Sequence, residues 1–316
     1  MVTALNSTLW RKNRDMSTFF KQIYRYTRPR SYRHNENLWP FCRITHALTG
    51  DITQLRYKGQ LVPLVPLTDW HHRFSGDALI TATGLSINEM DFAGLPAMTV
   101  VGVNGAYALK DRLDFQLYII VDMSFIDRRT DVLRAIIADP TLTLFTTLHG
   151  IARIIDRFTL PAVRCRLALI EDACYRIYQP RVPGNGVGRH FGQDPHIRFN
   201  PDYPDIAFTT DIRNGIFDAG TVVFWALQIL LYLGFTRLYI AGLDMTNFHQ
   251  PRFYESDYDK LPSFLAEKFT SVIVPAFTLA REVLQQNGVE VKNLSLNSAL
   301  CGEIFEKVSF DDTFQD

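Results

Sequence analysis

The sequence has few cysteines, no excess of charge of either sign and no long apolar run, and each lack excludes a class of protein. Its four cysteines form no CxxC pair and no Cys/His group with metal-ligand spacing, which argues against a zinc module or a disulfide scaffold. The 33 basic and 33 acidic residues cancel, so nothing favours nucleic acid as a partner. No apolar run reaches the roughly 18 residues that span a bilayer, and residues 1–20 lack a signal-peptide core. We therefore expect a cytoplasmic protein with reduced thiols.

The length and the apolar content of the chain, in contrast, are sufficient for a large folded domain. With 316 residues, of which 47% are hydrophobic and 21% charged, the chain can bury a full core as one large domain with an appendage. Regular strand and helix patterns begin near residue 77. We expect residues 1–76 to form an N-terminal arm and lead-in, and residues 77–316 to form the main domain, with a lid at about residues 178–210.

The stretch from residue 211 to residue 250 carries the most information. An apolar helix is expected from about Thr221 to Leu233, and a short buried strand, Leu238–Ala241, follows it. Gly220 and Thr221 would present free backbone N–H groups to an anion, and Asp244 follows the strand. Ligands of open α/β sheets bind at this edge. The alternative is an ordinary helix–strand unit of any parallel α/β protein.

Three further apolar strands, over residues 78–82, 98–103 and 118–121, end in small or polar residues: Thr83 and Gly84, Asn104 and Gly105, and Asp122. Ser86, just after the first end, is expected to cap a short helix. Because the carboxyl ends of parallel strands share one edge, these residues would line one crevice. Turn chemistry explains each end separately, but explains their recurrence less well. The sequence thus predicts an α/β fold with a mainly parallel, Rossmann-like sheet, helices on both faces and a loop or lid insertion.

Two segments break this pattern. Residues 178–203 are rich in glycine and proline and carry basic residues, among them Arg189 and Arg198, which suit a carboxylate or phosphate. Such a stretch inside a compact domain is usually a functional loop or lid, and a disordered linker is the alternative. Residues 11–33 hold eight basic residues against one acid, interleaved with aromatics. They match an anionic membrane surface or a phosphorylated glycolipid; a solvated or packed arm is the alternative.

Four blocks of sequence, in order between about Leu79 and Phe305, resemble bacterial sialyltransferases of the Campylobacter type and related lipopolysaccharide-core transferases, including Kdo transferases. The blocks are ITATGLSINEMD, VVGVNGAYAL, GTVVFWALQILLYLGFTRLYIAGLDM and NLSLNSALCGEIF. The resemblance implies a single-sheet, GT-A-like glycosyltransferase fold, a CMP-activated 2-keto sugar acid as donor and a lipid-linked core oligosaccharide as acceptor. It also implies no metal, no other cofactor, a homo-oligomer and, with the basic arm, a peripheral place at the inner membrane.

The same resemblance assigns the donor site. It places Gly84 and Ser86 at the nucleotide end of the donor and Asn104, with the adjoining Gly105, at the cytidine monophosphate. It adds Asp122 as a polar donor contact and Gly220 with Thr221 at the nucleotide, and Asn297 and Ser298 would close over it. Two departures stand out. Thr83 occupies the position of an Asn in the sialyltransferases, and Tyr254 is the only nearby candidate for a tyrosine pair that holds their leaving phosphate.

The chemistry requires a base for the acceptor hydroxyl and donors for the departing phosphate. His249 is the favoured base, because it follows a strand end and imidazole titrates near neutral pH; a surface histidine is the alternative. Asp122 is the rival base, and Asp244 lies at a strand mouth beside the site. Arg189, Arg198 and Arg252 are candidates for binding the phosphate or the sugar carboxylate.

Several functions fit these observations. The favoured one is transfer of Kdo from CMP-Kdo to lipopolysaccharide core. The runner-up, a CMP-sialic acid-dependent sialyltransferase, is disfavoured by the missing tyrosine pair. A pterin pyrophosphokinase-like enzyme would need Mg²⁺, for which Asp122 and Asp244 are available carboxylates. A non-catalytic glycolipid-binding protein would bind no nucleotide.

Overall fold

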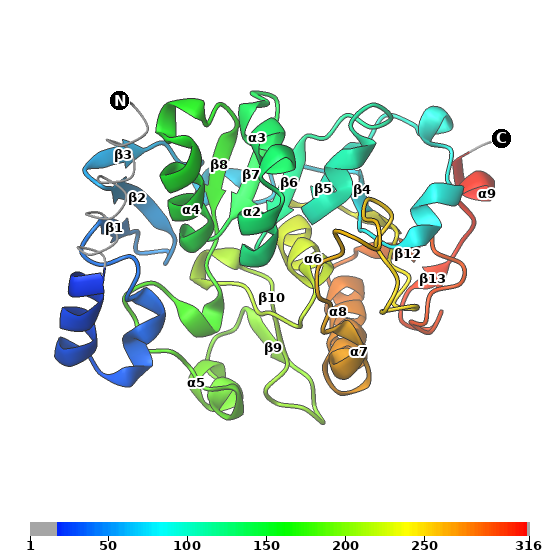
Figure 1. The fold of residues 1–316 in the computed structure, drawn as a ribbon. Coiled ribbons are helices and arrows are strands. Elements are labelled where there is room, and N and C mark those ends of the chain that lie inside the picture. The colour runs from blue at the N-terminus through cyan, green and yellow to red at the C-terminus, as the bar shows by residue number, and fades with distance from the viewer. Residues whose placement is uncertain (1–17, 315–316) are drawn as a thin grey trace, which may run out of the picture.

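A computed structural model describes residues 18–314 and is built around one large parallel sheet (Figure 1). The eight strands lie in the order β13-β12-β11-β4-β5-β6-β7-β8, and every neighbouring pair is parallel. Their bounds are β4 (Asp77–Thr81), β5 (Thr99–Val103), β6 (Leu117–Ile120), β7 (Thr143–Thr146), β8 (Arg166–Leu169), β11 (Arg237–Ala241), β12 (Glu290–Asn293) and β13 (Glu306–Lys307). The predicted α/β class with a mainly parallel sheet is confirmed.

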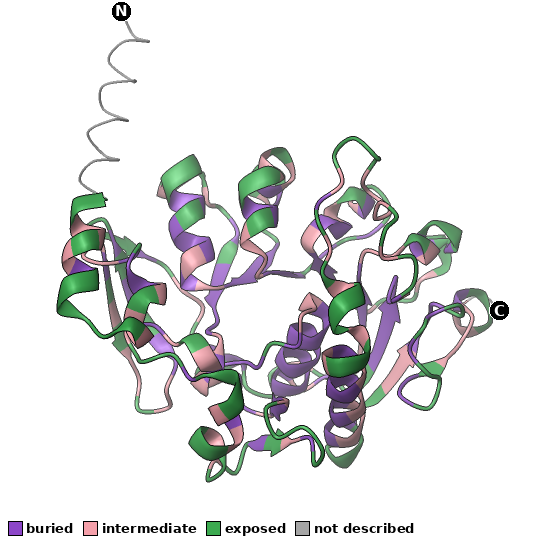
Figure 2. Cartoon of the chain, turned by 60° about the horizontal axis from the view of Figure 1, so that its bottom comes forward, coloured by how far each residue is buried: buried purple, intermediate pink, exposed green. Residues whose placement is uncertain are grey.

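Helices cover both faces of this sheet, as predicted, because alternate residues of each strand point to opposite sides. Ala78 and Ile80 of β4 join a core cluster with α6 (Val222–Leu233) and α8 (Val274–Gln286). Leu79 joins the other cluster, with α2 (Met123–Arg128), α3 (Thr130–Ala138) and α4 (Leu148–Phe158). Figure 2 shows α6 and α8 mostly buried, whereas α3 and α4 expose an outer side.

The order of the strands fixes where a ligand can bind. From β4 the chain builds the sheet outward through β5, β6, β7 and β8, and later returns to add β11 on the other side of β4. The direction in which successive strands are added to the sheet therefore reverses between β4 and β11. The loops that leave the carboxyl ends of these two strands diverge there, and such switch points are the usual ligand sites of open α/β sheets.

A three-stranded antiparallel sheet occupies part of the N-terminal region. It consists of β1 (Cys42–His46), β2 (Ile52–Tyr57) and β3 (Gln60–Val62), and it was not predicted from the sequence. Residues 18–27 are helical, and a 3-10 turn, η1 (Arg30–Asn35), follows. Tyr57 joins the small sheet to α4 by donating its hydroxyl to Asp156 Oδ2 at 3.0 Å. Residues 11–17 of the expected basic arm lie outside the described residues.

The expected lid is more regular than its composition indicates. It contains α5 (Val187–Phe191) and a hairpin of β9 (Ile197–Phe199) and β10 (Ala207–Thr209). Phe208 is fully buried and packs edge-on against Phe224 of α6, with ring centroids 5.5 Å apart. The alternative of a disordered linker is therefore wrong, because apolar residues spaced among the glycines and prolines anchor this segment beneath α6.

The sequence pattern predicts a largely helical segment over residues 257–286, but the helix begins later. Residues 249–264 form a loop, and α7 (Leu265–Lys268), a π-helical turn η10 (Phe269–Ile273) and α8 follow. Pro262 disfavours helical geometry in the residue before it. The remaining short helices are η2 (Leu67–Trp70), η3 (Leu85–Glu89), η4 (Phe92–Gly94), η5 (Asn104–Leu109), η6 (Leu160–Ala162), η7 (Ala173–Tyr175), η8 (Gly184–Gly186), η9 (Ile212–Asn214) and α9 (Phe310–Phe314).

Candidate active site

A cavity of about 350 Å³ opens at the switch point of the sheet. Its wall is formed by the carboxyl ends of β4, β5, β6 and β11, by the N-terminus of α6, by the chain between β11 and α7, and by α7 itself. It brings together eight residues that the sequence analysis selected: Thr83, Gly84, Asn104, Asp122, Gly220, Thr221, Asp244 and Arg252. These residues come from segments up to 169 positions apart, so the fold and not the sequence spacing assembles them.

The turns after β4 and β11 are in direct contact. A Cβ atom on Gly84 would lie 2.4 Å from the Asp244 carboxylate, so glycine is required there. The carboxylate oxygens of Asp244 accept hydrogen bonds from the backbone N–H of Ser86, at 3.0 Å, and from its hydroxyl. Ser86 therefore does not cap the short helix as expected, because Gly84 is the N-cap residue of η3 and makes no side-chain cap. Both oxygens of Asp244 are thus used to join the two turns.

Asn104 presents an acceptor without a partner. It adopts a left-handed backbone conformation, with φ of 46°. Its carboxamide oxygen Oδ1 is buried and has no hydrogen-bond partner among the described residues, although the residue lines the cavity. The cost of a buried, unpaired acceptor is offset when a ligand donates to it. An exocyclic amino group or a hydroxyl group would satisfy this oxygen.

Asp122 is half-buried at the mouth of β6 and caps α2. Its Oδ1 accepts from the backbone N–H of Ser124 at 2.7 Å, and no described residue bonds to its other oxygen. A carboxylate fixed by one oxygen and open at the other has the geometry of a general base.

The N-terminus of α6 forms another part of the wall. Thr221 is the N-cap residue, and Gly220 has φ of 79°. Asp218 accepts from the N–H of Gly220 at 3.1 Å and from Trp225 Nε1 at 2.9 Å, and it lines the cavity. Lys268 lines the cavity as well. Neither side chain was predicted from the sequence; the DAGT sequence before the helix was a signal for Asp218, whereas nothing in the pattern indicated Lys268.

Asp172 lies behind Asp218 and does not line the cavity. Burial is the main reason that its pKa is raised to about 7, and the negative charge of Asp218 contributes. The N–H of Cys174 donates to its Oδ1 at 2.8 Å. Near neutral pH this carboxyl group therefore holds a proton for part of the time, which keeps the charge behind Asp218 small.

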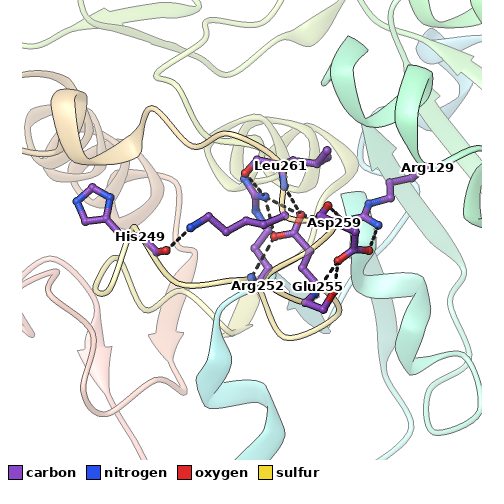
Figure 3. A network of polar contacts seen from close by, with 8 residues as sticks. Arg129, His249, Arg252, Glu255, Asp259 and Leu261 are labelled. Carbon is purple, nitrogen blue, oxygen red and sulfur yellow. Dashed lines mark hydrogen bonds and ion pairs between the residues drawn. The ribbon is translucent and has the colours of Figure 1, made fainter.

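The loop after β11 is held by a buried carboxylate (Figure 3). The Glu255 side chain has no exposed surface, and it accepts hydrogen bonds from Arg129 at 3.2 Å and from Arg252 Nη1 at 2.9 Å. The N–H of Leu261 also donates to it, at 3.2 Å. Arg129 further binds Asp259 on the same loop. Glu255 thus orients Arg252, which lines the cavity.

Other predicted site residues lie outside the cavity wall. His249 is exposed, and in Figure 3 its ring points away from the arginine–glutamate network. Arg189 and Arg198 are exposed on α5 and β9. The expectation that these three residues face the site is wrong. Arg189 and Arg198 belong to elements that do not line the cavity, and His249 is exposed between Phe248 and Gln250, which do line it.

The remaining predicted residues support the wall from behind or lie apart from it. Tyr254 packs against the backbone of Gly105, where an added Cβ would lie 2.1 Å from its ring, and neither residue lines the cavity. Ser298 is buried and donates to the carbonyl of Leu243 at 2.6 Å. Asn297 is exposed.

In the part of the chain that the structure describes, no group of three or more His, Cys, Asp or Glu side chains is arranged to hold a metal ion. None of the helices among residues 18–314 is long and apolar enough to cross a bilayer.

Comparisons with known proteins gave one family match and several distant structural similarities. A search of curated proteins gave no match. The sialyltransferase CstII from Campylobacter jejuni, in complex with cytidine-5'-monophosphate, is similar with a TM-score of 0.40 and 14% identity over 72% of this chain and 83% of that chain. CST-II with a trisaccharide acceptor and CMP has a TM-score of 0.39 and 14% identity, over 72% of this chain and 84% of that chain. A family model described as 3-deoxy-D-manno-octulosonic acid (Kdo) transferase WaaZ matches residues 205–310. Over residues 205–310, this match confirms the predicted resemblance to Kdo transferases.

Proposed function

We propose that the protein transfers Kdo from CMP-Kdo to a hydroxyl group of the lipopolysaccharide core oligosaccharide. The proposal rests on one observation: the cavity at the switch point lies largely within the segment that matches the family model. Most residues of the cavity wall, from Asp218 to Lys268, lie inside the matched range of residues 205–310. The specific donor, Kdo in preference to sialic acid, rests on this match.

The reaction joins the acceptor oxygen to the anomeric carbon C2 of the sugar acid. The bond from C2 to the phosphate oxygen breaks, its electron pair leaves with CMP, and the proton of the acceptor hydroxyl passes to a base. Positive side chains in the cavity neutralise the departing phosphate monoester. We propose that no metal ion takes part, because a monophosphate leaving group carries less charge than the diphosphate of other sugar donors.

We assign the base to Asp122 and not to His249. Among the carboxylates of the cavity wall, Asp244 and Asp218 each accept hydrogen bonds on both oxygens. Asp122 uses one oxygen for Ser124 and leaves the other open to a substrate hydroxyl. His249 does not line the cavity.

Thermal stabilisation by nucleotides tests this proposal without an acceptor. We expect CMP to raise the melting temperature in the absence of Mg²⁺, since a ligand at 100 times its Kd adds about 2.7 kcal/mol to the free energy of unfolding. CDP, UDP and GDP, each with and without Mg²⁺, are the comparison ligands. Stabilisation by another nucleotide only with Mg²⁺ would favour the pyrophosphokinase, and no response to any nucleotide would favour a glycolipid-binding protein. Turnover of CMP-Kdo against CMP-sialic acid then decides the donor.

A second proposal concerns the membrane. Arg28, Arg30 and Arg33 are exposed and make no ion pair in the described region, whereas Lys21 and Arg25 are paired with Glu36. Tyr26 nearby is 90% exposed. We propose that these groups bind the anionic surface on which a lipid-linked acceptor lies, at about 1 kcal/mol per basic residue.

Replacing these three arginines by glutamate is therefore expected to reduce sedimentation with vesicles that contain anionic lipid at least tenfold at low salt. Neutral vesicles provide the control, and binding of the triple variant equal to that of the wild type would remove the membrane role from this segment.

A further inference from the structure

Lys268 is a cationic residue of the cavity wall whose individual part in the proposed reaction has not yet been assigned. The wall contains two cationic side chains, Arg252 and Lys268, and three carboxylates. Arg252 is bonded to Glu255. Lys268 has neither a hydrogen-bond partner nor an ion-pair partner for its ammonium group anywhere in residues 18–314, although Asp218 belongs to the same wall. An exposed lysine is ordinarily only solvated, so a role for Lys268 has to follow from where its side chain lies.

That position is set by an irregular helix. Lys268 is the last residue of α7, and the π-helical turn η10 separates it from α8. Pro275 follows at the start of α8 and has no N–H to continue the regular ladder. Such π-helical turns occur frequently at functional sites. Here the turn changes the helix register at the place where the chain faces the cavity.

The side chain of Lys268 extends over the N-terminus of α6. A Cβ atom on Gly220 would lie 3.1 Å from Lys268 Cδ and 3.8 Å from Nζ, so the glycine leaves the space that the lysine uses. The backbone N–H groups of Thr221 and Val222 have no protein partner in the described part of the chain. Free N–H groups at the positive end of a twelve-residue helix, together with an ammonium group, form an environment for an anion.

We propose that Lys268 binds the phosphate of the CMP moiety and neutralises the charge that develops on it as the bond to C2 breaks. This inference rests on the proposed function. The electron pair of the broken bond stays on the phosphate oxygen, and the ammonium group donates a hydrogen bond to that oxygen without giving up a proton. Lys268 thus touches the leaving group and is a catalytic residue of the reaction.

The test separates the phosphate from the rest of the nucleotide. Binding of CMP and of cytidine is measured by calorimetry for the wild type, Lys268→Met, Lys268→Gln and Lys268→Arg. Because charge-assisted hydrogen bonds are among the stronger ones, we expect the Met and Gln variants to bind CMP ten- to a hundredfold more weakly. Their affinity for cytidine should change less than twofold, and the Arg variant should retain most of the preference for CMP.

Lys292→Met is the matched control, because Lys292 lies on β12 and pairs with Glu290 outside the cavity. It should bind both ligands as the wild type does. A wild-type protein with no affinity for CMP would overturn the proposed function itself. If the wild type prefers CMP to cytidine and both Lys268→Met and Lys268→Gln keep that preference, the role of Lys268 is wrong and the proposed function stands.

Discussion

Asp122→Asn is expected to lower kcat for transfer from CMP-Kdo by about a thousandfold, within the usual range of general-base contributions. The substitution removes the ability to accept the acceptor proton but preserves the shape of the side chain. Asparagine is also a good N-cap residue, so its carbonyl oxygen can accept from Ser124 N–H as Asp122 Oδ1 does. Helix α2 and the affinity for CMP should therefore change little. The measurements are kcat with a core oligosaccharide acceptor and the Kd for CMP.

His249→Ala is the control for this assignment. Its exposed side chain lies outside the cavity wall, so turnover of this variant should be close to that of the wild type. The assignment fails if the histidine variant loses most of its activity while Asp122→Asn retains it, because the base would then reside on the loop after β11.

The sheet was predictable because parallel strands are buried on both faces and appear in the sequence as short, continuous apolar runs. The strand β4 is an example, with Ala78, Leu79 and Ile80 all fully buried. Each of these strands ends at a glycine or a polar residue, so the strand-end part of the site was visible too. Helix α6 was predicted almost to the residue, since Thr221 caps its start and Gly234 adopts a left-handed conformation at its end.

The loop after β11 was not predictable from spacing. His249 lies only five residues after Asp244, and the sequence analysis placed it in the site on that ground. Met245 and Asn247 both have φ of 51°, however, a conformation that non-glycine residues rarely adopt. The chain therefore turns sharply twice, and His249 emerges at the surface. Amino-acid propensities give no reason to expect a left-handed backbone conformation at Met245.

Lys268 was missed for a related reason. It lies in a predicted helix whose apolar periodicity indicates only which face is buried, and the π-helical turn η10 alters the register on which such a pattern depends. Glu255 was missed because acidic residues are seldom buried. Only the tertiary structure shows that Arg129, from a distant segment, joins Arg252 of the same loop in binding it.

Glu255→Ala is expected to have the largest effect on stability. The buried carboxylate is shared by Arg129, which follows α2, and by Arg252 of the loop, and its removal leaves two partly buried guanidinium groups without it. Removal of one partner from such a network usually costs about 3 kcal/mol or more in the free energy of unfolding. Denaturant unfolding measures this loss, and Glu255→Gln should show a smaller one because amide and carboxylate have similar shapes.

The same substitution separates the loop from the rest of the site. Since Glu255 also accepts from the backbone N–H groups of Arg252 and Leu261, its loss should accelerate amide hydrogen exchange over residues 249–264, whereas α6 should keep its protection. KM for the donor should rise, because Arg252 is no longer held at the cavity wall. Asp259→Asn is the matched control, since Asp259 pairs with Arg129 from an exposed position and its loss should matter much less. If both variants destabilise the protein equally, Glu255 does not hold this loop over the cavity.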